Sequence, residues 1–329
     1  MQTEWSRRGF FGVAGAAGLF VAVACSSEKP AAGTAGGGAV TIKHAFGETT
    51  VPAPPKRVVS AGFTEQDDLL AVGVVPVAVT DWFGGEPFAV WPWAQSKLGT
   101  AQPAVLSIAD GIQINQIAAL KPDLIIATNA GVDADTYQKL SAIAPTIPQS
   151  GTDAFFEPWK DQATTIGMVT FQADKMSSLI SAIDEGFKTV ATNNPQFKDK
   201  KLLLLQGNTF WENSVTAKLP GWRTDFLTAM GFTIPDSITP FARDDRAIIP
   251  LDKIGPVLDA ADVLVWSTES DADQAALLAD PQIAALKATK ENRNVFTTKE
   301  LAGAMAFSSA LSLPVVTQQL PPLVAKALR

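Results

Sequence analysis

Short apolar runs alternate with helical patterns in the first half of the chain. The run Arg57–Ser60 ends at small residues, and a helical pattern then continues through Leu69 to Gly73. Glycine directly after a helical pattern is typical of a helix C-terminus. Apolar runs at 74–79 and 123–127 follow, with helical spacing between them, so the pattern predicts buried strands connected by helices.

The same order of elements returns after residue 200. Lys201–Gly207 reads as a strand, a helical pattern closes at Gly231, and 232–234 and 262–266 read as further strands. Matching positions are separated by similar intervals: Val58 and Leu202, Gly73 and Gly231, Asp123 and Asp262. We therefore expect an α/β fold of two similar lobes, each a parallel sheet with flanking helices. Chance similarity between generic strand–helix units is the alternative.

One long amphipathic segment separates the two halves. Its apolar positions keep to one face from about 174 to 191, and Asn193-Asn194-Pro195 ends it. The predicted domains are therefore an N-terminal lobe (39–170), a connecting helix (171–195) and a C-terminal lobe (196–329). A helix of about 20 residues is ~30 Å long, so we expect one stiff strut between the lobes. Ligands of open parallel sheets bind outside the carboxyl ends of the strands, which predicts a cleft between the lobes.

The N-terminal segment indicates export. Arg7-Arg8 precedes a short apolar stretch that ends at Ala24, a pattern that predicts a signal peptide over 1–24 and the twin-arginine route. Small residues precede Cys25, as at a lipoprotein cleavage site, so we expect lipid on Cys25. Residues 25–38 are rich in Ser, Gly, Ala and Thr and read as a flexible tether. The predicted location is the outer face of the cytoplasmic membrane.

Composition excludes several classes of function. The chain carries 26 basic and 33 acidic residues, a net charge of −7, which argues against nucleic acid as a partner. With one His, one Cys and one Tyr, a bare metal site of several imidazoles cannot be assembled, and we expect His44 and Tyr137 to be structural. No nucleophile elbow, phosphate loop or dinucleotide fingerprint is present, so we predict that the protein is not an enzyme.

Aromatic and basic residues cluster in the segments that follow predicted strands, and aromatic walls suit flat or ring-containing ligands. The candidate ligand-binding residues are Trp82, Phe83, Trp91, Trp93, Phe155, Phe156, Phe210, Trp211, Arg223, Arg243 and Arg246. Core packing is the alternative for each aromatic residue, and a charged surface loop with internal Arg–Asp pairing is the alternative for 243–246. Lys299 and Met305, expected in the loop after Val295–Thr298, are further candidates.

Several blocks of sequence resemble one known family. They are Thr41–Pro52, Pro55–Val59, Ile117–Ile126 and Tyr137–Thr146. In this order they resemble the iron–siderophore and vitamin B12 class of periplasmic substrate-binding proteins, the class III fold with a single long helix. The resemblance implies capture of a pre-chelated iron complex, a ferric siderophore, for an ABC permease and its ATPase. The family's permease-docking glutamates fall at Asn115 and, in a looser register, near Asp252.

Two alternatives keep the fold but change the function. A haem or corrinoid could occupy the same cleft, although the composition offers little for strong axial ligation of haem. The chain could also be a surface interaction protein with no small-molecule cargo.

Overall fold

Two separate sheets form the framework of the protein. The computed structural model describes residues 38–207 and 213–329. The first sheet has the order β5-β4-β3-β6-β7 and all its neighbouring strands are parallel. Its strands are β3 (Val58–Ser60), β4 (Ala78–Thr80), β5 (Ala104–Leu106), β6 (Leu124–Ala127) and β7 (Thr146–Pro148). A hairpin of β1 (Val40–His44) and β2 (Gly47–Val51) precedes it.

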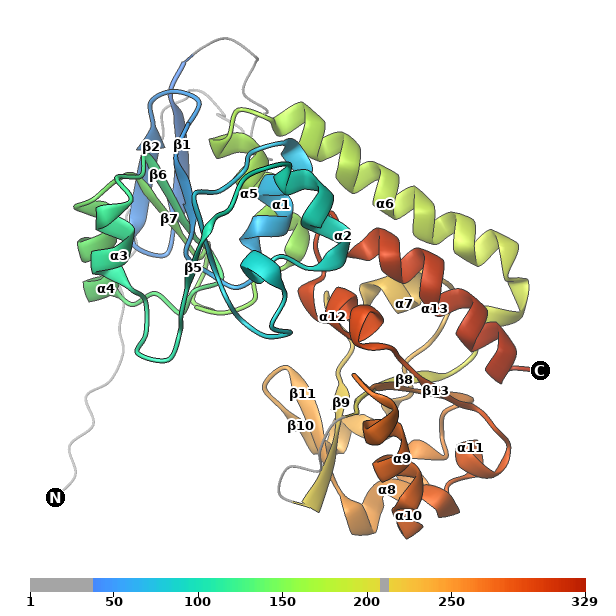
Figure 1. Ribbon diagram of the computed structural model, residues 1–329. Helices are drawn as coiled ribbons and strands as arrows, with labels where there is room; N and C mark the ends of the chain where they lie inside the picture. The colour runs from blue at the N-terminus through green and yellow to red at the C-terminus, as the bar shows by residue number, and fades with distance from the viewer. Residues whose placement is uncertain (1–37, 208–212) are drawn as a thin grey trace, which may run out of the picture. The chain divides into compact units, whose positions relative to one another are not determined.

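Helices cover both faces of the first sheet. These are α1 (Glu65–Val72), α2 (Pro92–Gln95), α3 (Ile114–Ala119), α4 (Ala134–Ser141) and α5 (Trp159–Val169). Helices α1 and α5 lie on one side, and α3 and α4 on the other (Figure 1). Right-handed connections between parallel strands place the helices on opposite faces of the sheet, because β4 and β5 lie on one side of β3 while β6 and β7 lie on the other. We call this sheet and its helices the first lobe.

The second sheet is mixed. Its order is β10-β11-β9-β8-β12-β13, with bounds Leu202–Gln206 (β8), Ser214–Lys218 (β9), Ala242–Arg243 (β10), Arg246–Pro250 (β11), Val263–Ser267 (β12) and Asn294–Phe296 (β13). Strands β8, β12 and β13 are parallel, whereas β9, β11 and β10 add antiparallel pairs. The α/β class with parallel sheets is confirmed, but the sequence reading missed this antiparallel extension, and 243–246 is a hairpin rather than a loop.

Short helices flank the second sheet and complete the second lobe. They are α7 (Asp225–Ala229), α8 (Ile254–Leu258), α9 (Asp271–Ala279), α10 (Pro281–Ala285) and α11 (Lys287–Lys290). The segment 232–234, expected as a strand, contributes a single bridge between Thr233 and Lys201. No helix within residues 38–207 and 213–329 is long and apolar enough to cross a membrane.

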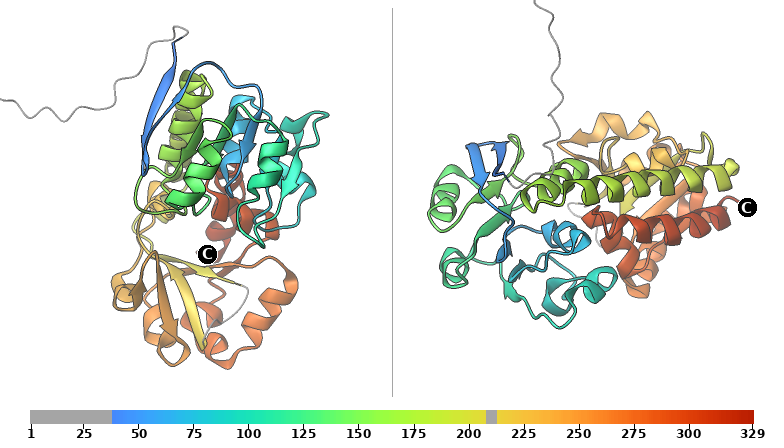
Figure 2. Two further views of the ribbon diagram at one scale, coloured as in Figure 1. Left: turned by 90° about the vertical axis from the view of Figure 1, so that its left-hand side faces the viewer. Right: turned by 90° about the horizontal axis from the view of Figure 1, so that it is seen from above.

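The lobes are braced by more than one segment. Helix α6 (Ala173–Asn193) runs between them within the predicted 171–195 segment, and α13 (Leu313–Ala327) packs beside it (Figure 2). Before α13, the chain leaves the second lobe through α12 (Lys299–Phe307). Ser309 Oγ donates to Asp67 Oδ2 at 2.5 Å, and the Ala310 amide donates to Asp68 Oδ1 at 3.1 Å. Helix α6 is the single long helix expected between the lobes, and the C-terminal segment adds contacts with the first lobe that the sequence did not predict.

Candidate functional site

A cavity of about 310 Å³ lies between the two lobes. Its walls come from the loops after β4 and β7, from β8, β9 and β11, and from α12. The lining residues are Trp82, Phe83, Phe156, Leu204, Leu205, Gln206, Thr216, Lys218, Arg223, Asp245, Arg246, Ser267, Glu269, Ala302, Met305 and Ala306. Carboxyl ends of parallel strands meet at one edge of a sheet, which is why residues so far apart in sequence converge here.

The first lobe supplies an aromatic wall. Trp82 meets Phe83 edge to face with ring centres 4.6 Å apart, and Phe156 lies 4.9 Å from Trp82. Behind them, Phe63 stacks on Trp82 at 5.5 Å and nearly parallel, which backs the indole with a second ring. Such contacts fix ring positions, because each aromatic side chain has only two rotatable bonds and prefers offset or edge-on neighbours. The wall is therefore formed before a ligand arrives.

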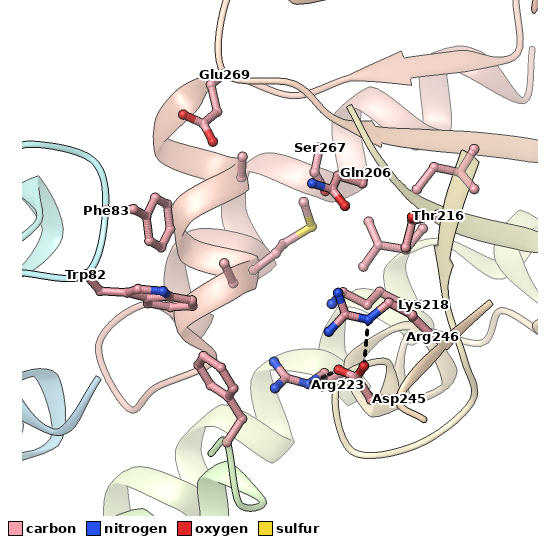
Figure 3. A pocket seen from close by; sticks show the side chains of 16 residues that line it. Trp82, Phe83, Gln206, Thr216, Lys218, Arg223, Asp245, Arg246, Ser267 and Glu269 are labelled. Atoms are coloured by element: carbon pink, nitrogen blue, oxygen red, sulfur yellow. Dashed lines mark hydrogen bonds and ion pairs between the residues drawn. The ribbon is translucent and has the colours of Figure 1, made fainter. Parts of the chain in front are cut away.

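The second lobe supplies a basic wall opposite these rings (Figure 3). Arg246 and Lys218 are cross-strand partners on β11 and β9. Asp245 accepts a hydrogen bond from Arg246 Nε at 2.8 Å and lies 3.4 Å from Arg223 Nε. Three cations thus face two carboxylates, Asp245 and Glu269, among the lining residues. The excess of positive charge favours a ligand with negative charge on its surface.

The pKa shifts reflect this crowding. Burial, together with the nearby Arg223 and Arg246 and against the opposing effect of Asp245, lowers the pKa of Lys218 to about 8. Burial alone would raise the pKa of Asp245, but the Arg246 hydrogen bond and the surrounding cations outweigh it and lower the pKa. A second anion entering the cavity would relieve the repulsion between the cations.

Six of the residues predicted from the sequence line the cavity: Trp82, Phe83, Phe156, Arg223, Arg246 and the further candidate Met305. Arg223 lies two residues before the start of α7, and its guanidinium stacks on Phe156. Asp245 pairs with both arginines, so the internal Arg–Asp pairing considered as the alternative occurs within the cavity wall itself. Their contact with a ligand stays a prediction.

Three predicted aromatic residues lie elsewhere. Trp91 is only 1% exposed and stacks on Trp93 at 4.9 Å, behind Phe83. Trp93 is partly buried, and its Nε1 donates to the buried Asp67 Oδ2 at 2.8 Å, which holds this indole against the core. Phe155 is 44% exposed and stacks on Phe63 rather than lining the cavity. These rings support or flank the wall, and the core-packing alternative holds for Trp91 and Trp93.

The other predicted positions fall outside the cavity wall or outside the described residues. Arg243 is exposed on β10 and is not a lining residue. Asn115 is exposed on α3, and the exposed Asp252 pairs with Lys253 at 3.0 Å, so permease docking stays a prediction. Phe210, Trp211, Cys25 and the 1–24 segment lie outside the described residues.

Several cavity residues were missed. Lys218 and Thr216 point to one face of β9, as alternating positions of a strand do, and the alternation Ser214–Lys218 is the signal that could have found them. Phe63, which backs Trp82 without lining the cavity, was also missed, although it follows β3 much as Trp82 follows β4. Met305 lines the cavity from helix α12, not from a loop as expected. Lys299 begins the same helix but binds the first lobe instead of lining the cavity.

His44 is held by protein contacts. Its Nε2 lies 3.0 Å from Thr49 Oγ1, its Nδ1 accepts the Phe46 amide at 3.2 Å, and its ring packs on Tyr137. These contacts fit the structural role expected for His44 and Tyr137. Among the residues that the structure describes, no group of three or more His, Cys, Asp or Glu side chains could hold a metal ion.

A periplasmic binding protein model matches residues 58–301, which span both lobes and the cavity. This chain belongs to the periplasmic binding protein family. The crystal structure of a periplasmic solute binding protein from Mycobacterium smegmatis is 63% identical, with a TM-score of 0.85 over 89% of this chain and 99% of that one. Streptococcus pneumoniae PiaA in complex with ferrichrome has the same fold, with 22% identity and a TM-score of 0.72 over 88% and 98%.

Curated relatives of this periplasmic binding protein match over shorter stretches. The probable siderophore-binding lipoprotein YfiY of Bacillus subtilis is 31% identical over 44% of this chain and 42% of its own length. The petrobactin-binding protein YclQ, also of Bacillus subtilis, is 29% identical over 50% of this chain and 51% of its own length. The matches thus span about half the length of these relatives.

Proposed function

We propose that this periplasmic binding protein captures a ferric siderophore between its lobes and delivers it to an ABC permease with its ATPase. The observation that carries the proposal is the cavity with Trp82 and Phe83 on one side and Lys218 and Arg246 on the other. Aromatic faces suit the rings and apolar edges of a chelator, while arginine can fork onto its oxygens. The iron arrives with its own ligands, so the protein needs to supply none.

The basic wall narrows the class of chelate. Three cations against two carboxylates favour ferric complexes with net negative charge, such as those of catecholate or carboxylate chelators, over neutral ones. The names of the Bacillus subtilis relatives support this class, since they include siderophore-, petrobactin- and Fe(3+)-citrate-binding proteins. The protein acts by binding and release, without chemistry on the ligand.

The proposal includes export and anchoring. Residues 1–24 direct secretion through the twin-arginine route, Cys25 carries the lipid, and residues up to 38 tether the lobes to the outer face of the cytoplasmic membrane. Two or more acyl chains anchor a protein stably. The lipoprotein names of two relatives support this part. A Cys25→Ser variant should move the protein from the membrane fraction to the medium or periplasm; retention in the membrane would contradict it.

Intrinsic fluorescence tests the binding function. Trp82 lies in the cavity wall, so a bound ferric chelate should quench its emission. A panel of anionic ferric siderophores, neutral ferrichrome, haem and cobalamin should show saturable quenching at the lowest concentrations for an anionic ferric siderophore. Tighter binding of haem or cobalamin than of every ferric siderophore would replace the proposed cargo. Absence of saturable binding across the panel would favour an interaction protein without cargo.

A further inference from the structure

The loop after β4, residues 81–90, carries Trp82 and Phe83 into the cavity, and we call it the aromatic loop. Its backbone adopts uncommon conformations: φ is 99° at Gly84, 63° at Gly85, 57° at Phe88 and 53° at Ala89. Left-handed backbone at non-glycine residues persists only where the surrounding structure holds it in place. Contacts outside the loop must therefore fix its shape.

Two residues of α12 contact this loop from the far end of the chain: the Phe307 ring packs on Trp82 and Phe83, with ring centres 5.6 and 5.9 Å apart, and Lys299 makes a polar contact. Its Nζ donates to the Gly84 carbonyl at 2.6 Å and to Glu86 Oε1 at 2.7 Å. The Glu86 side chain is 16% exposed and the Lys299 side chain 43%, so the Glu86 end of this ion pair is sheltered from water. Charge-assisted hydrogen bonds in such a setting are stronger than exposed ones.

The position of Lys299 in its helix argues that this contact has a role beyond helix stability. Lys299 is the first residue of α12, where the helix dipole disfavours a cation. The same helix lines the cavity through Ala302, Met305 and Ala306. Its Gly303 packs so closely on Trp91 that a Cβ there would lie within van der Waals overlap of the indole. Helix α12 therefore forms one wall of the cavity and holds the aromatic loop that forms another.

We propose that the contact of Lys299 with Glu86 and Gly84 positions Trp82 and Phe83 and thereby sets the affinity and size selectivity of the cavity. Lys299 and Glu86 are positioning residues, because neither lines the cavity. With the contact intact, the aromatic wall is ordered before binding and the ligand does not have to order it. Without it, the loop gains freedom, and the cavity accepts ligands of different sizes with more similar, weaker affinities. This inference rests on the proposed function.

The test compares Lys299→Met and Glu86→Gln with Lys299→Arg and with a control, Lys160→Met. Lys160 pairs with Asp184 at 2.7 Å, an ion pair of the same length away from the cavity. Dissociation constants for ferric dicitrate and ferric petrobactin, two chelates of different size, are measured by fluorescence quenching. We expect about tenfold weaker binding of the preferred chelate and a severalfold smaller preference in Lys299→Met and Glu86→Gln. Lys299→Arg should restore both within threefold, and Lys160→Met should change neither.

A ligand-free measurement separates this inference from the proposed function. Acrylamide quenching of each protein and of its Trp82→Phe counterpart gives the accessibility of Trp82 by difference. Accessibility should rise in Lys299→Met and Glu86→Gln but not in Lys160→Met. Unchanged accessibility, or an unchanged preference between the chelates, overturns the positioning role. If the unmodified protein binds no ferric chelate, the proposed function fails, and the acrylamide result still decides whether Lys299 positions the loop.

Discussion

The guanidinium carbon of Arg223 lies 4.4 Å from the ring centre of Phe156, so a cation of the second lobe covers an aromatic ring of the first. The same guanidinium carbon lies 4.4 Å from the ring centre of Trp222. This stack joins the lobes at the cavity wall, where Arg223 also pairs with Asp245. Its charge is therefore placed by three contacts before a ligand binds.

Arg223 should contribute strongly to affinity. We expect Arg223→Ala to weaken binding of an anionic ferric siderophore about tenfold or more, equivalent to about 1.4 kcal/mol, because a fixed, partly buried cation is lost. Arg243→Ala is the matched control, since Arg243 is exposed on β10 and does not line the cavity. Titration of both variants checks this, and equal losses would mean that placement in the cavity does not decide affinity.

Trp82 should account for most of the fluorescence quenching that a bound ferric siderophore causes. Replacement of Trp82 by Ala removes the indole that contacts Phe83, Phe156 and Phe63, and we expect at least tenfold weaker binding with loss of most quenching. Phe155→Ala, at an exposed ring outside the cavity wall, should have a smaller effect. Quenching titrations of the two variants measure the difference. A Trp82→Ala protein with unchanged affinity would remove this residue from the site.

Ligand binding should move the lobes little. Helix α6 connects them, α13 packs beside it, and Ser309 and Ala310 bond to the buried carboxylates of Asp67 and Asp68. A hinge closure would have to bend α6 and also break the contacts of the C-terminal segment with the first lobe. Small-angle X-ray scattering curves of the free and ligand-saturated protein should superimpose. A clear decrease of the radius of gyration on binding would show that the lobes close despite these contacts.

The carboxyl groups of α1 should make stability depend on pH. Burial raises the pKa of Glu65 to about 7, of Asp67 to about 6 and of Asp68 to about 7. Hydrogen bonds to these groups come from Thr64, Trp93, Thr128, Asn129, Gln162, Ser309 and Ala310, none of which carries a charge. The carboxylates are therefore partnered only by neutral donors.

The direction in which the free energy of unfolding changes with pH follows from proton binding. Between about pH 4 and pH 7 the folded protein holds protons on these groups that the unfolded chain has released. Their stabilisation is complete below the unfolded pKa values and is lost as the pH rises through about 6 to 7. The lowered pKa of His44 acts in the opposite direction, but for one proton only. We expect the free energy of unfolding in urea to fall from pH 5 to pH 8, and Asp68→Asn to reduce this slope. A rising free energy over this range would contradict the account.

Sequence alone could place the strands and, through them, part of the site. Trp82 and Phe156 follow strands of a parallel sheet, and the strand-end rule is enough to bring them to one edge. The strand-end rule could not tell which of Trp82 and Trp91 lines the cavity. Trp91 lies in the core because of the backbone conformation of residues 84–89 and the close approach of Gly303 from α12. That approach depends on contacts between distant segments of the chain.

The basic wall shows a similar limit. Arg246 was found because two arginines stand near each other in the sequence, but Lys218 becomes its neighbour only when β9 pairs with β11. The contact of the C-terminal segment with α1 could not be predicted from the sequence either. Nothing in the sequence near Asp67 or Ser309 indicates that these two polar residues form a hydrogen bond with each other. Local patterns predict elements well, whereas pairing across the fold decides which side chains share a cavity.

Anomalous diffraction at the iron edge tests the central claim most directly. Crystals of the protein saturated with the ferric siderophore that quenches its fluorescence best should show one strong iron peak inside the cavity, between Trp82 and Arg246. An iron peak outside this cavity, or an occupied cavity whose ligand touches neither residue, would contradict it.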